Sequence, residues 1–379
     1  MLISYKYRIY PTKKQEEILA KTFGCVRFVW NKNVETWNNR GTYKSSTEYR
    51  NEFEFLKEIS SASVQQKEID FKEFKSQKFN KNRKKKLGNP KFKSKYDKQS
   101  FRLPNQKFKL VGNKIQLEKI GKIKIVMDRI PTGKFMSVTV SKDLCGSYYA
   151  SILSDDIVLQ PVKTNNSVGI DVGIKALITT SDGLQIKNLP NNQRKIKHIQ
   201  RRLAKKKKGS RKYKELKLRL AKLHRTIARK RAWLLHNISK HLVENYDLIV
   251  TEDLNVAGMM KNHKLAGSIQ RASWSELFRM IEYKCKFYGK EFVKISRWFP
   301  SSKMCHKCGA IKDDLTLKDR IYNCDCGFSI DRDLNASLNI KAVGVTTAIQ
   351  SVMGCKTYSK ELSLKQAIPN DLTRFLYKS

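Results

Sequence analysis

The chain has 379 residues, of which 40% are hydrophobic, so it is long and apolar enough for two or three domains. Lysine and arginine number 78 against 34 aspartates and glutamates, a formal net charge of +44. This self-repulsion implies a polyanionic partner, and nucleic acid is the usual one. No lipidation motif, apolar signal core or run of about 18 apolar residues favours a membrane. We expect a soluble cytoplasmic protein.

The N-terminal region is predicted to start with a strand and continue into helices. Residues 2–10 alternate apolar and basic side chains, which is typical of a strand. Thr12 is followed by Gln15 at the spacing of a capping box, so a helix is expected to begin there. Residues 47–79 again show a helical pattern with charged faces.

Residues 80–105 are strongly basic, are broken by Gly-Asn-Pro, and are interleaved with Phe92, Tyr96 and Phe101. Basic side chains neutralise phosphates, and aromatic rings stack on unpaired bases. The alternative is a solvated linker, but the aromatic residues favour contact with nucleic acid. The candidate contacts in this segment are Lys84, Lys85, Lys86, Lys91 and Lys93.

Residues 107–155 read as several strands separated by Gly-Asn and Pro-Thr-Gly turns, which predicts a small β-barrel or sheet. The next strand is expected in the run SVGIDVGIKALITTSDG, residues 167–183, whose Ser-Asp-Gly end predicts a hairpin turn. Val168 and Ile170 alternate on the buried face, and Asp171 is predicted at the middle of the opposite face. A lone carboxylate there is unfavourable unless it is solvated, paired or holding a cation.

A long basic helical region is predicted over residues 191–245, with a break at Gly209-Ser210 that makes it a helical hairpin. Its densest charge lies at the break, and we expect these side chains to follow a phosphate backbone, the alternative being a solvated face. They are Lys205, Lys206, Lys207, Lys208 and Arg211.

Two further acidic motifs follow. Leu248 to Val250 reads as a short buried strand, with Glu252 and Asp253 at its carboxyl end, where ligands bind in open α/β sheets. Asp331 is placed to cap a helix, and Asp333 falls in the first turn of that helix. Separated carboxylates of this kind can hold Mg²⁺, and two ions about 3.5–4 Å apart can promote phosphodiester hydrolysis. The alternative is that each acid is a cap or a surface charge.

Four of the eight cysteines are clustered, in the sequences CHKCG and CDCG. Four thiolates suit a closed tetrahedral Zn²⁺ site with a structural role. The second pair is one residue tighter than a C-x-x-C knuckle, so His306 is a possible substitute ligand. The predicted ligands are Cys305, Cys308, Cys324 and Cys326.

Together, GIDVGIKAL, TEDLN, WFPSSKMCHKCG with YNCDCG, and IDRDLNASLNI resemble the TnpB family of transposon-encoded RNA-guided nucleases, which are related to type V CRISPR effectors. The opening YKYRIYPTKKQEEIL and FGCVRFVWN, and the later NPKFKSKYDKQSFR, resemble the same family. The similarity covers nearly the whole chain. The shortened second cysteine pair is the one departure that matters.

The resemblance implies a multidomain α/β and β-barrel protein with an RNase H-like, RuvC-type nuclease core, an inserted zinc ribbon, and a β-barrel wedge domain interrupted by a helical recognition domain. The expected boundaries are 1–10 and 103–165 for the wedge, 11–102 for the recognition domain with its basic segment, 166–300 and 328–355 for the nuclease, 301–327 for the zinc ribbon, and 356–379 for a C-terminal tail.

The resemblance also implies a Mg²⁺-dependent DNA endonuclease whose catalytic acids are Asp171, Glu252 and Asp333, which would hold two Mg²⁺ ions beside one structural Zn²⁺. Asp331 is the alternative to Asp333, and Asp253 is expected not to bind metal. A guide RNA from the transposon end would pair with double-stranded target DNA, and we expect a monomer without an obligatory protein partner.

The protein would read only a short motif next to the target. Residues Ser63, Gln65 and Gln66 are candidate readers because glutamine can form two hydrogen bonds with adenine, although an ordinary polar helix surface explains them equally well.

Two rival functions differ in their requirements. A nuclease-inactive RNA-guided repressor would have lost acids that are present here, whereas a guide-independent RNase H-type transposase or resolvase would work without RNA.

Overall fold

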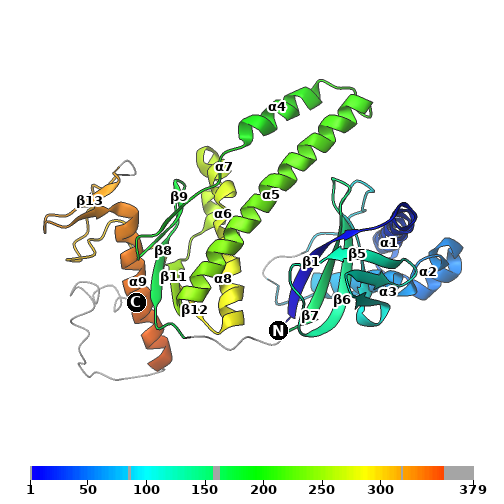
Figure 1. Ribbon diagram of the computed structural model, residues 1–379, viewed down its shortest axis with the longest axis horizontal. Coiled ribbons are helices and arrows are strands. Elements are labelled where there is room, and N and C mark those ends of the chain that lie inside the picture. Colours follow the sequence, from blue (N-terminus) through cyan, green and yellow to red (C-terminus); the bar gives the residue numbers. More distant parts are fainter. Residues whose placement is uncertain (1, 84–86, 157–162, 317–318, 354–379) are drawn as a thin grey trace. The chain divides into compact units, whose positions relative to one another are not determined.

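The computed structural model describes residues 2–83, 87–156, 163–316 and 319–353, and the chain divides into two compact units at residue 157 (Figure 1). Three predicted contacts, Lys84, Lys85 and Lys86, lie outside the described residues, as does the predicted tail at 356–379.

The first unit contains a curled seven-stranded antiparallel sheet in the order β2-β6-β7-β1-β5-β4-β3. The first strand of the chain pairs with β7 on one side and β5 on the other, so it lies inside the sheet. The strands are β1 (Leu2–Tyr10), β2 (Gln99–Pro104), β3 (Phe108–Val111), β4 (Lys114–Leu117), β5 (Gly121–Val126), β6 (Lys134–Lys142) and β7 (Tyr148–Asp155), and a 3₁₀ turn, η2 (Asn105–Lys107), follows β2.

The helices of this unit precede all but the first strand. The predicted capping box begins α1 (Lys13–Arg40): the Gln15 amide donates to Thr12 Oγ1 at 3.4 Å, and the Thr12 amide donates to Gln15 Oε1 at 3.0 Å. The predicted helical stretch 47–79 is divided into α2 (Ser46–Glu52), a 3₁₀ turn η1 (Glu54–Lys57) and α3 (Ser61–Lys78).

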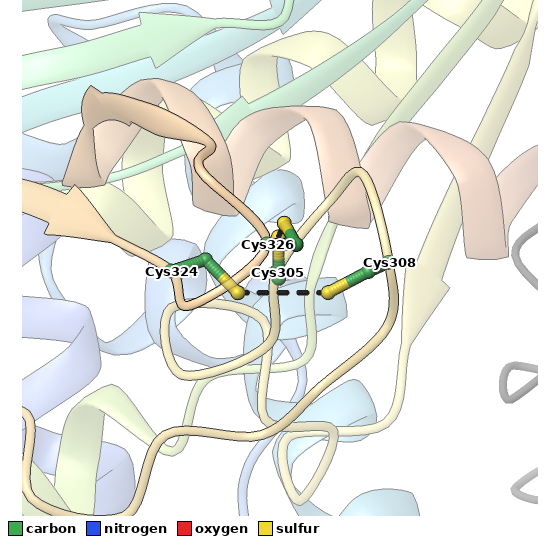
Figure 2. Close-up of side chains that lie close together, drawn as sticks. All are labelled: Cys305, Cys308, Cys324 and Cys326. Carbon is green, nitrogen blue, oxygen red and sulfur yellow. Dashed lines mark hydrogen bonds between the residues drawn. The ribbon is translucent and has the colours of Figure 1, made fainter.

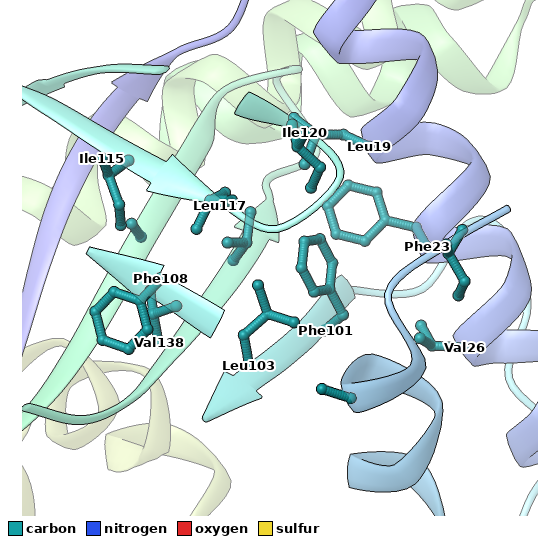
Figure 3. Packing of buried hydrophobic residues seen from close by; sticks show 14 of the residues in the cluster. Leu19, Phe23, Val26, Phe101, Leu103, Phe108, Ile115, Leu117, Ile120 and Val138 are labelled. Carbon is teal, nitrogen blue, oxygen red and sulfur yellow. The ribbon is translucent and has the colours of Figure 1, made fainter. Parts of the chain in front are cut away.

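Helix α1 and the sheet share one apolar core, shown in part in Figure 3. Leu19 and Phe23 of α1 pack with Phe101 and Leu103 of β2, and the two phenylalanine rings lie 5.5 Å apart. The expectation that Phe101 stacks on bases is therefore wrong, because its side chain is buried in the core. It belongs to a strand that the basic composition of residues 80–105 concealed.

The second unit is built on a five-stranded sheet in the order β10-β9-β8-β11-β12. Strands β8, β11 and β12 are parallel, and β9 and β10 extend the sheet in antiparallel fashion. The strands are β8 (Ser167–Asp171), β9 (Ala176–Thr180), β10 (Gln185–Lys187), β11 (Leu248–Glu252) and β12 (Glu291–Ile295), and β13 (Ile321–Asn323) and β14 (Ser329–Asp331) form a separate pair.

Helices cover both faces of the five-stranded sheet. Val168 and Ile170 of β8 pack in one cluster with residues of α5 and α8, whereas Val250 of β11 packs with Ile340 and Val343 of α9. The helices are α4 (Gln193–Ala204), α5 (Arg211–Asn245), α6 (Val256–Met259), α7 (His263–Ala272), α8 (Trp274–Tyr288) and α9 (Arg332–Met353).

The predicted helical hairpin is confirmed. Helix α4 lies against α5, and the chain reverses at Gly209, which has a φ of 87° that favours glycine (Figure 1). Ser210 then caps α5 by accepting a hydrogen bond from the Tyr213 amide at 3.2 Å.

Candidate active site

Two acidic residues end two adjacent parallel strands of the second unit. Asp171 is the last residue of β8, and Glu252 is the last residue of β11. The register pairs Ile170 with Thr251, so both carboxylates lie at the same edge of the sheet. The prediction of Asp171 at the middle of a strand is wrong, because β8 ends there.

A third acid, Asp333, is brought to this edge by α9, which begins at Arg332 and packs across β8 and β11. Two glycines permit the close packing. A Cβ built at Gly169 would lie 2.1 Å from the carbonyl oxygen of Ser337, and one built at Gly344 would lie 2.2 Å from a methyl group of Val250. Contacts this short leave no room for a side chain, so both positions require glycine.

The three carboxylates interact electrostatically. Burial raises the pKa of Asp171 well above its ordinary value, and the charges of Glu252 and Asp333 raise it further. The amide of Val172 and the guanidinium of Arg332 act in the opposite direction. The site therefore holds more negative charge than its own cations balance, which is the condition under which a bound divalent cation is stabilising.

Among the described residues, Glu252 is bound by a side chain that the sequence did not suggest. The hydroxyl of Ser301 donates a hydrogen bond to Glu252 Oε1. Burial raises the pKa of Glu252, and this hydrogen bond partly opposes the rise. Ser301 lies in the loop that follows β12, so only the folding of that loop brings it to the carboxylate.

The structure separates the roles of the neighbouring acids. Asp331 Oδ1 accepts hydrogen bonds at 3.0 Å from the amides of Asp333 and Leu334, so Asp331 caps α9 as predicted. Asp253 forms an ion pair with Arg297. The charge of Asp333, in contrast, is one of the causes that raise the pKa of Asp171.

The four predicted cysteine ligands lie together, and their thiols face one another (Figure 2). The Cys305 and Cys326 sulfurs are 3.8 Å apart, and those of Cys308 and Cys324 are 3.5 Å apart. Tetrahedral Zn²⁺ with Zn–S bonds of about 2.3 Å would separate its sulfurs by about 3.8 Å. The donor set therefore fits zinc.

Among the described residues, these cysteines are the one group of three or more candidate ligands whose donor atoms all lie within 4.8 Å of one another. The oxygens of Asp171, Glu252 and Asp333 are spread more widely. The alternative zinc ligand His306 is engaged elsewhere, since its Nδ1 lies 3.1 Å from Asn339 Oδ1.

Two buried asparagines of α9 connect the cysteine cluster with the carboxylate edge. Asn339 Nδ2 donates to the carbonyls of Ser301 and Met304, each at 2.8 Å. Asn335 Nδ2 donates to the Met304 carbonyl at 2.7 Å, and its Oδ1 accepts from the His306 amide at 3.1 Å. Sequence reasoning missed both residues, although asparagines four positions apart on a buried helix face are a usable signal.

The predicted phosphate contacts of the second unit are accessible. The side chains of Lys205 to Lys208 are exposed in the connection between α4 and α5. Arg211 is also exposed and pairs with Glu215 at 3.1 Å in the first turn of α5.

The predicted nucleic-acid contacts of the first unit, Lys91 and Lys93, lie in a segment whose backbone is bonded to α1. Lys91 and Lys93 belong to a segment tied to α1 through Trp30 and Asn31: Trp30 Nε1 donates to the Lys91 carbonyl at 3.0 Å, and the Lys93 amide donates to Asn31 Oδ1 at 2.7 Å. The Lys93 ammonium lies 3.9 Å from the centre of the Trp30 ring. These contacts hold the backbone of the segment on α1, whereas its side chains from Lys91 to Lys98 remain exposed.

The predicted motif readers lie on α3. Gln65 is exposed and Gln66 is half-buried, whereas Ser63 is fully buried and its hydroxyl donates to the Ser60 carbonyl at 2.7 Å. Ser63 therefore presents no group to DNA in this structure.

No helix in the described part of the chain is long and apolar enough to span a membrane.

Three stretches match known families. Residues 1–43 match a "Helix-turn-helix domain", residues 136–263 a "Probable transposase", and residues 274–340 a "Cas12f1-like, TNB domain". A Streptomyces pristinaespiralis protein named "Putative RNA-guided DNA endonuclease" is 36% identical over 365 residues, covering 91% of this chain and 90% of that protein. The chain belongs to the TnpB family. The resemblance predicted from the motifs is thereby confirmed.

An Escherichia coli protein named "Putative RNA-guided DNA endonuclease InsQ" is 29% identical to this TnpB-family chain, with 90% of this chain and 92% of that protein covered. The fold is similar to the Cas12f1 chain of a cryo-EM structure of the Cas12f1–sgRNA–target DNA complex, with a TM-score of 0.52, 13% identity, and coverage of 90% of this chain and 98% of that chain. In this TnpB-family chain, the stretch that matches the helix-turn-helix model contains the strand β1 (Leu2–Tyr10) and one continuous helix, α1 (Lys13–Arg40).

Proposed function

We propose that this chain is an RNA-guided DNA endonuclease that hydrolyses target DNA next to a short adjacent motif. The observation that carries the proposal is the meeting of Asp171, Glu252 and Asp333 at one edge of the second sheet, where their charges act on one another. The names of the TnpB-family relatives support the same activity.

The proposed architecture is the one that the motifs imply. Residues 166–300 and 328–355 would form the RuvC-type nuclease, 301–327 the zinc ribbon, 1–10 and 103–165 the wedge, and 11–102 the recognition domain. A five-stranded sheet with helices on both faces, carrying acids at the carboxyl ends of its parallel strands, supports an RNase H-like nuclease. The curled antiparallel sheet supports the wedge.

Asp171, Glu252 and Asp333 would together hold two Mg²⁺ ions. The donor set is all oxygen, as Mg²⁺ prefers. Bound ions would supply the Lewis acidity that activates water and stabilises the leaving oxygen. Ser301 would hold one oxygen of Glu252 in place, and the α9 cap at Asp331 would fix the start of the helix that carries Asp333.

Cys305, Cys308, Cys324 and Cys326 would hold one Zn²⁺ with a structural role, because four thiolates leave no open coordination position. Elemental analysis of the purified, folded protein tests this directly. About one zinc per chain is expected, and metal-free folded protein would contradict it.

The exposed lysines at the α4–α5 connection would contact phosphates of the guide RNA or of the RNA–DNA heteroduplex. Base pairing by the guide would then supply the sequence specificity. A single chain carries all three acids, so we propose a monomer that binds guide RNA and double-stranded DNA.

The first test is to sequence the RNA that co-purifies when the protein is expressed beside its native flanking DNA. One bound species that ends in sequence matching the DNA beyond the element is expected. The complex should cleave a matched duplex with Mg²⁺, and Asp171→Ala should retain RNA and DNA binding but not cleave. Heterogeneous RNA that salt removes, with cleavage that survives ribonuclease treatment, would instead favour a guide-independent transposase or resolvase.

A further inference from the structure

We propose that Trp298 is a stacking platform for one base of the DNA strand held at the carboxylate edge, an inference that rests on the proposed nuclease function. Trp298 is 85% exposed, more than any other large hydrophobic side chain among the described residues. An exposed indole lacks the stabilising free energy, about 25 cal/mol per Å², that burial of its apolar surface would give. Its exposure therefore points to a ligand.

The loop that carries Trp298 is attached to the candidate catalytic residues at both ends. It begins after Ile295, which is paired with Glu252 in the register of β12 and β11. It ends at Ser301, whose hydroxyl donates to Glu252. A strand bound at Glu252 would therefore lie beside this loop.

The backbone on either side of Trp298 is held in place. Arg297 is anchored by its ion pair with Asp253, and the Phe299 amide donates to the Ser296 carbonyl at 3.1 Å. The Phe299 ring packs against the core cluster beneath α9. With both neighbours anchored, the indole is held away from the protein by a constrained loop.

A nucleic-acid base is the partner that best fits this position. The net charge of +44 indicates a polyanionic ligand. Because the three carboxylates at this edge repel phosphate groups, an uncharged aromatic ring is a favourable contact for the strand there. Every base has a π-face, so stacking on tryptophan tolerates any sequence. Sequence tolerance is what a nuclease needs when pairing with a guide selects its target.

The test is single-turnover cleavage by the complete guide complex, using target strands that each carry one abasic site near the cut. Trp298→Ala should cleave about tenfold more slowly, whereas Trp298→Phe, which keeps a stacking ring, should remain near the wild-type rate. Trp233→Ala, which removes a tryptophan that is 67% exposed on α5, is the matched control and should cleave normally. At one abasic position, wild-type cleavage should slow by about the same factor that Trp298→Ala loses on the intact strand. The abasic site at that position should not slow Trp298→Ala any further.

The proposal would be overturned if Trp298→Ala cleaved at the wild-type rate. It would also be overturned if, at every position tested, an abasic site slowed Trp298→Ala as much as it slows the wild type. If the wild-type complex cleaves nothing, the nuclease function fails by itself. Stacking is then measured with single-stranded DNA containing 2-aminopurine, whose fluorescence wild type and Trp298→Phe should quench more than Trp298→Ala. Equal quenching by all three would overturn the stacking proposal.

Discussion

Gly169 of β8 faces the backbone of α9 at Ser337, and a Cβ at Gly169 would lie 2.1 Å from the Ser337 carbonyl oxygen. This contact sets how closely the helix approaches the strand that ends in Asp171. It therefore determines where Asp333, one turn before Ser337, lies relative to the other two acids.

Gly169→Ala is expected to push α9 away from β8. The new methyl group meets backbone, which cannot turn aside as a flexible side chain can, so we expect a loss of stability of about 1–3 kcal/mol or more and a large loss of cleavage. Chemical denaturation and single-turnover cleavage measure the two effects. Gly24→Ala is the matched control: a Cβ at Gly24 of α1 meets nothing within 4 Å, so this variant should be unchanged or slightly stabilised. Equal behaviour of both variants would contradict the packing argument.

Substitution of Asp333 should mainly reduce cleavage, whereas substitution of Asp331 should mainly reduce stability. Asp333→Ala is expected to reduce cleavage by more than about 100-fold, since even the loss of a group that only supports a metal ligand reduces activity by 10–100-fold. Asp331→Ala should instead lower stability by about 1 kcal/mol through loss of the α9 cap, and Asp331→Asn, which can still cap, should restore it. Cleavage rates and thermal unfolding of the three variants are the measurements. Full activity of Asp333→Ala would remove this residue from the proposed site.

Asn339→Ala is expected to affect both the carboxylate edge and the cysteine cluster, because Asn339 bonds to the backbone of Ser301 and of Met304. The Ser301 carbonyl would lose its donor inside the protein, which lowers stability by about 1–3 kcal/mol. Because the same amide group holds the backbone before Cys305, zinc retention should also fall when the protein is dialysed against a chelator. Asn39→Ala, which alters an exposed asparagine of α1, should retain zinc and stability. Normal zinc retention by Asn339→Ala would show that the network does not support the cysteine cluster.

The stability of the second unit should depend on pH through Asp247. Burial raises the pKa of this carboxyl, but the Lys290 ammonium and the amides of Asn165 and Thr164 outweigh burial, so the pKa lies below its ordinary value. A depressed pKa stabilises the folded state above the unfolded-state value of about 3.9, and this contribution is lost as the pH falls through the folded-state pKa.

Asp247→Asn is therefore expected to be less stable by about 1–3 kcal/mol at pH 7, with a smaller difference at pH 4 and below. Denaturation midpoints measured across this range provide the check. The control Asp313→Asn changes a carboxylate that is 92% exposed and should have little effect at any pH. A deficit in Asp247→Asn that stays constant down to the acid limit would rule out the assigned cause.

Much of the local structure could be predicted from short-range patterns. The capping box at Thr12 and Gln15, the strand over residues 2–10 and the break at Gly209 depend on neighbouring residues alone, and all three are present in the structure. Failures occurred where composition concealed periodicity. Strand β2 lies in a basic stretch, and its alternation of buried Phe101 and Leu103 was outweighed by the surrounding lysines.

The sequence by itself determined the chemical groups of the site: three acids at the ends of elements, four clustered cysteines, and enough positive charge to require a polyanion. The tertiary structure alone decided which groups meet. Asp171 and Asp333 are separated by most of the second unit along the chain, and their proximity depends on the glycine contact between β8 and α9. Ser301, Asn335 and Asn339 acquire their roles only through hydrogen bonds between distant segments, and no local periodicity encodes a partner of that kind.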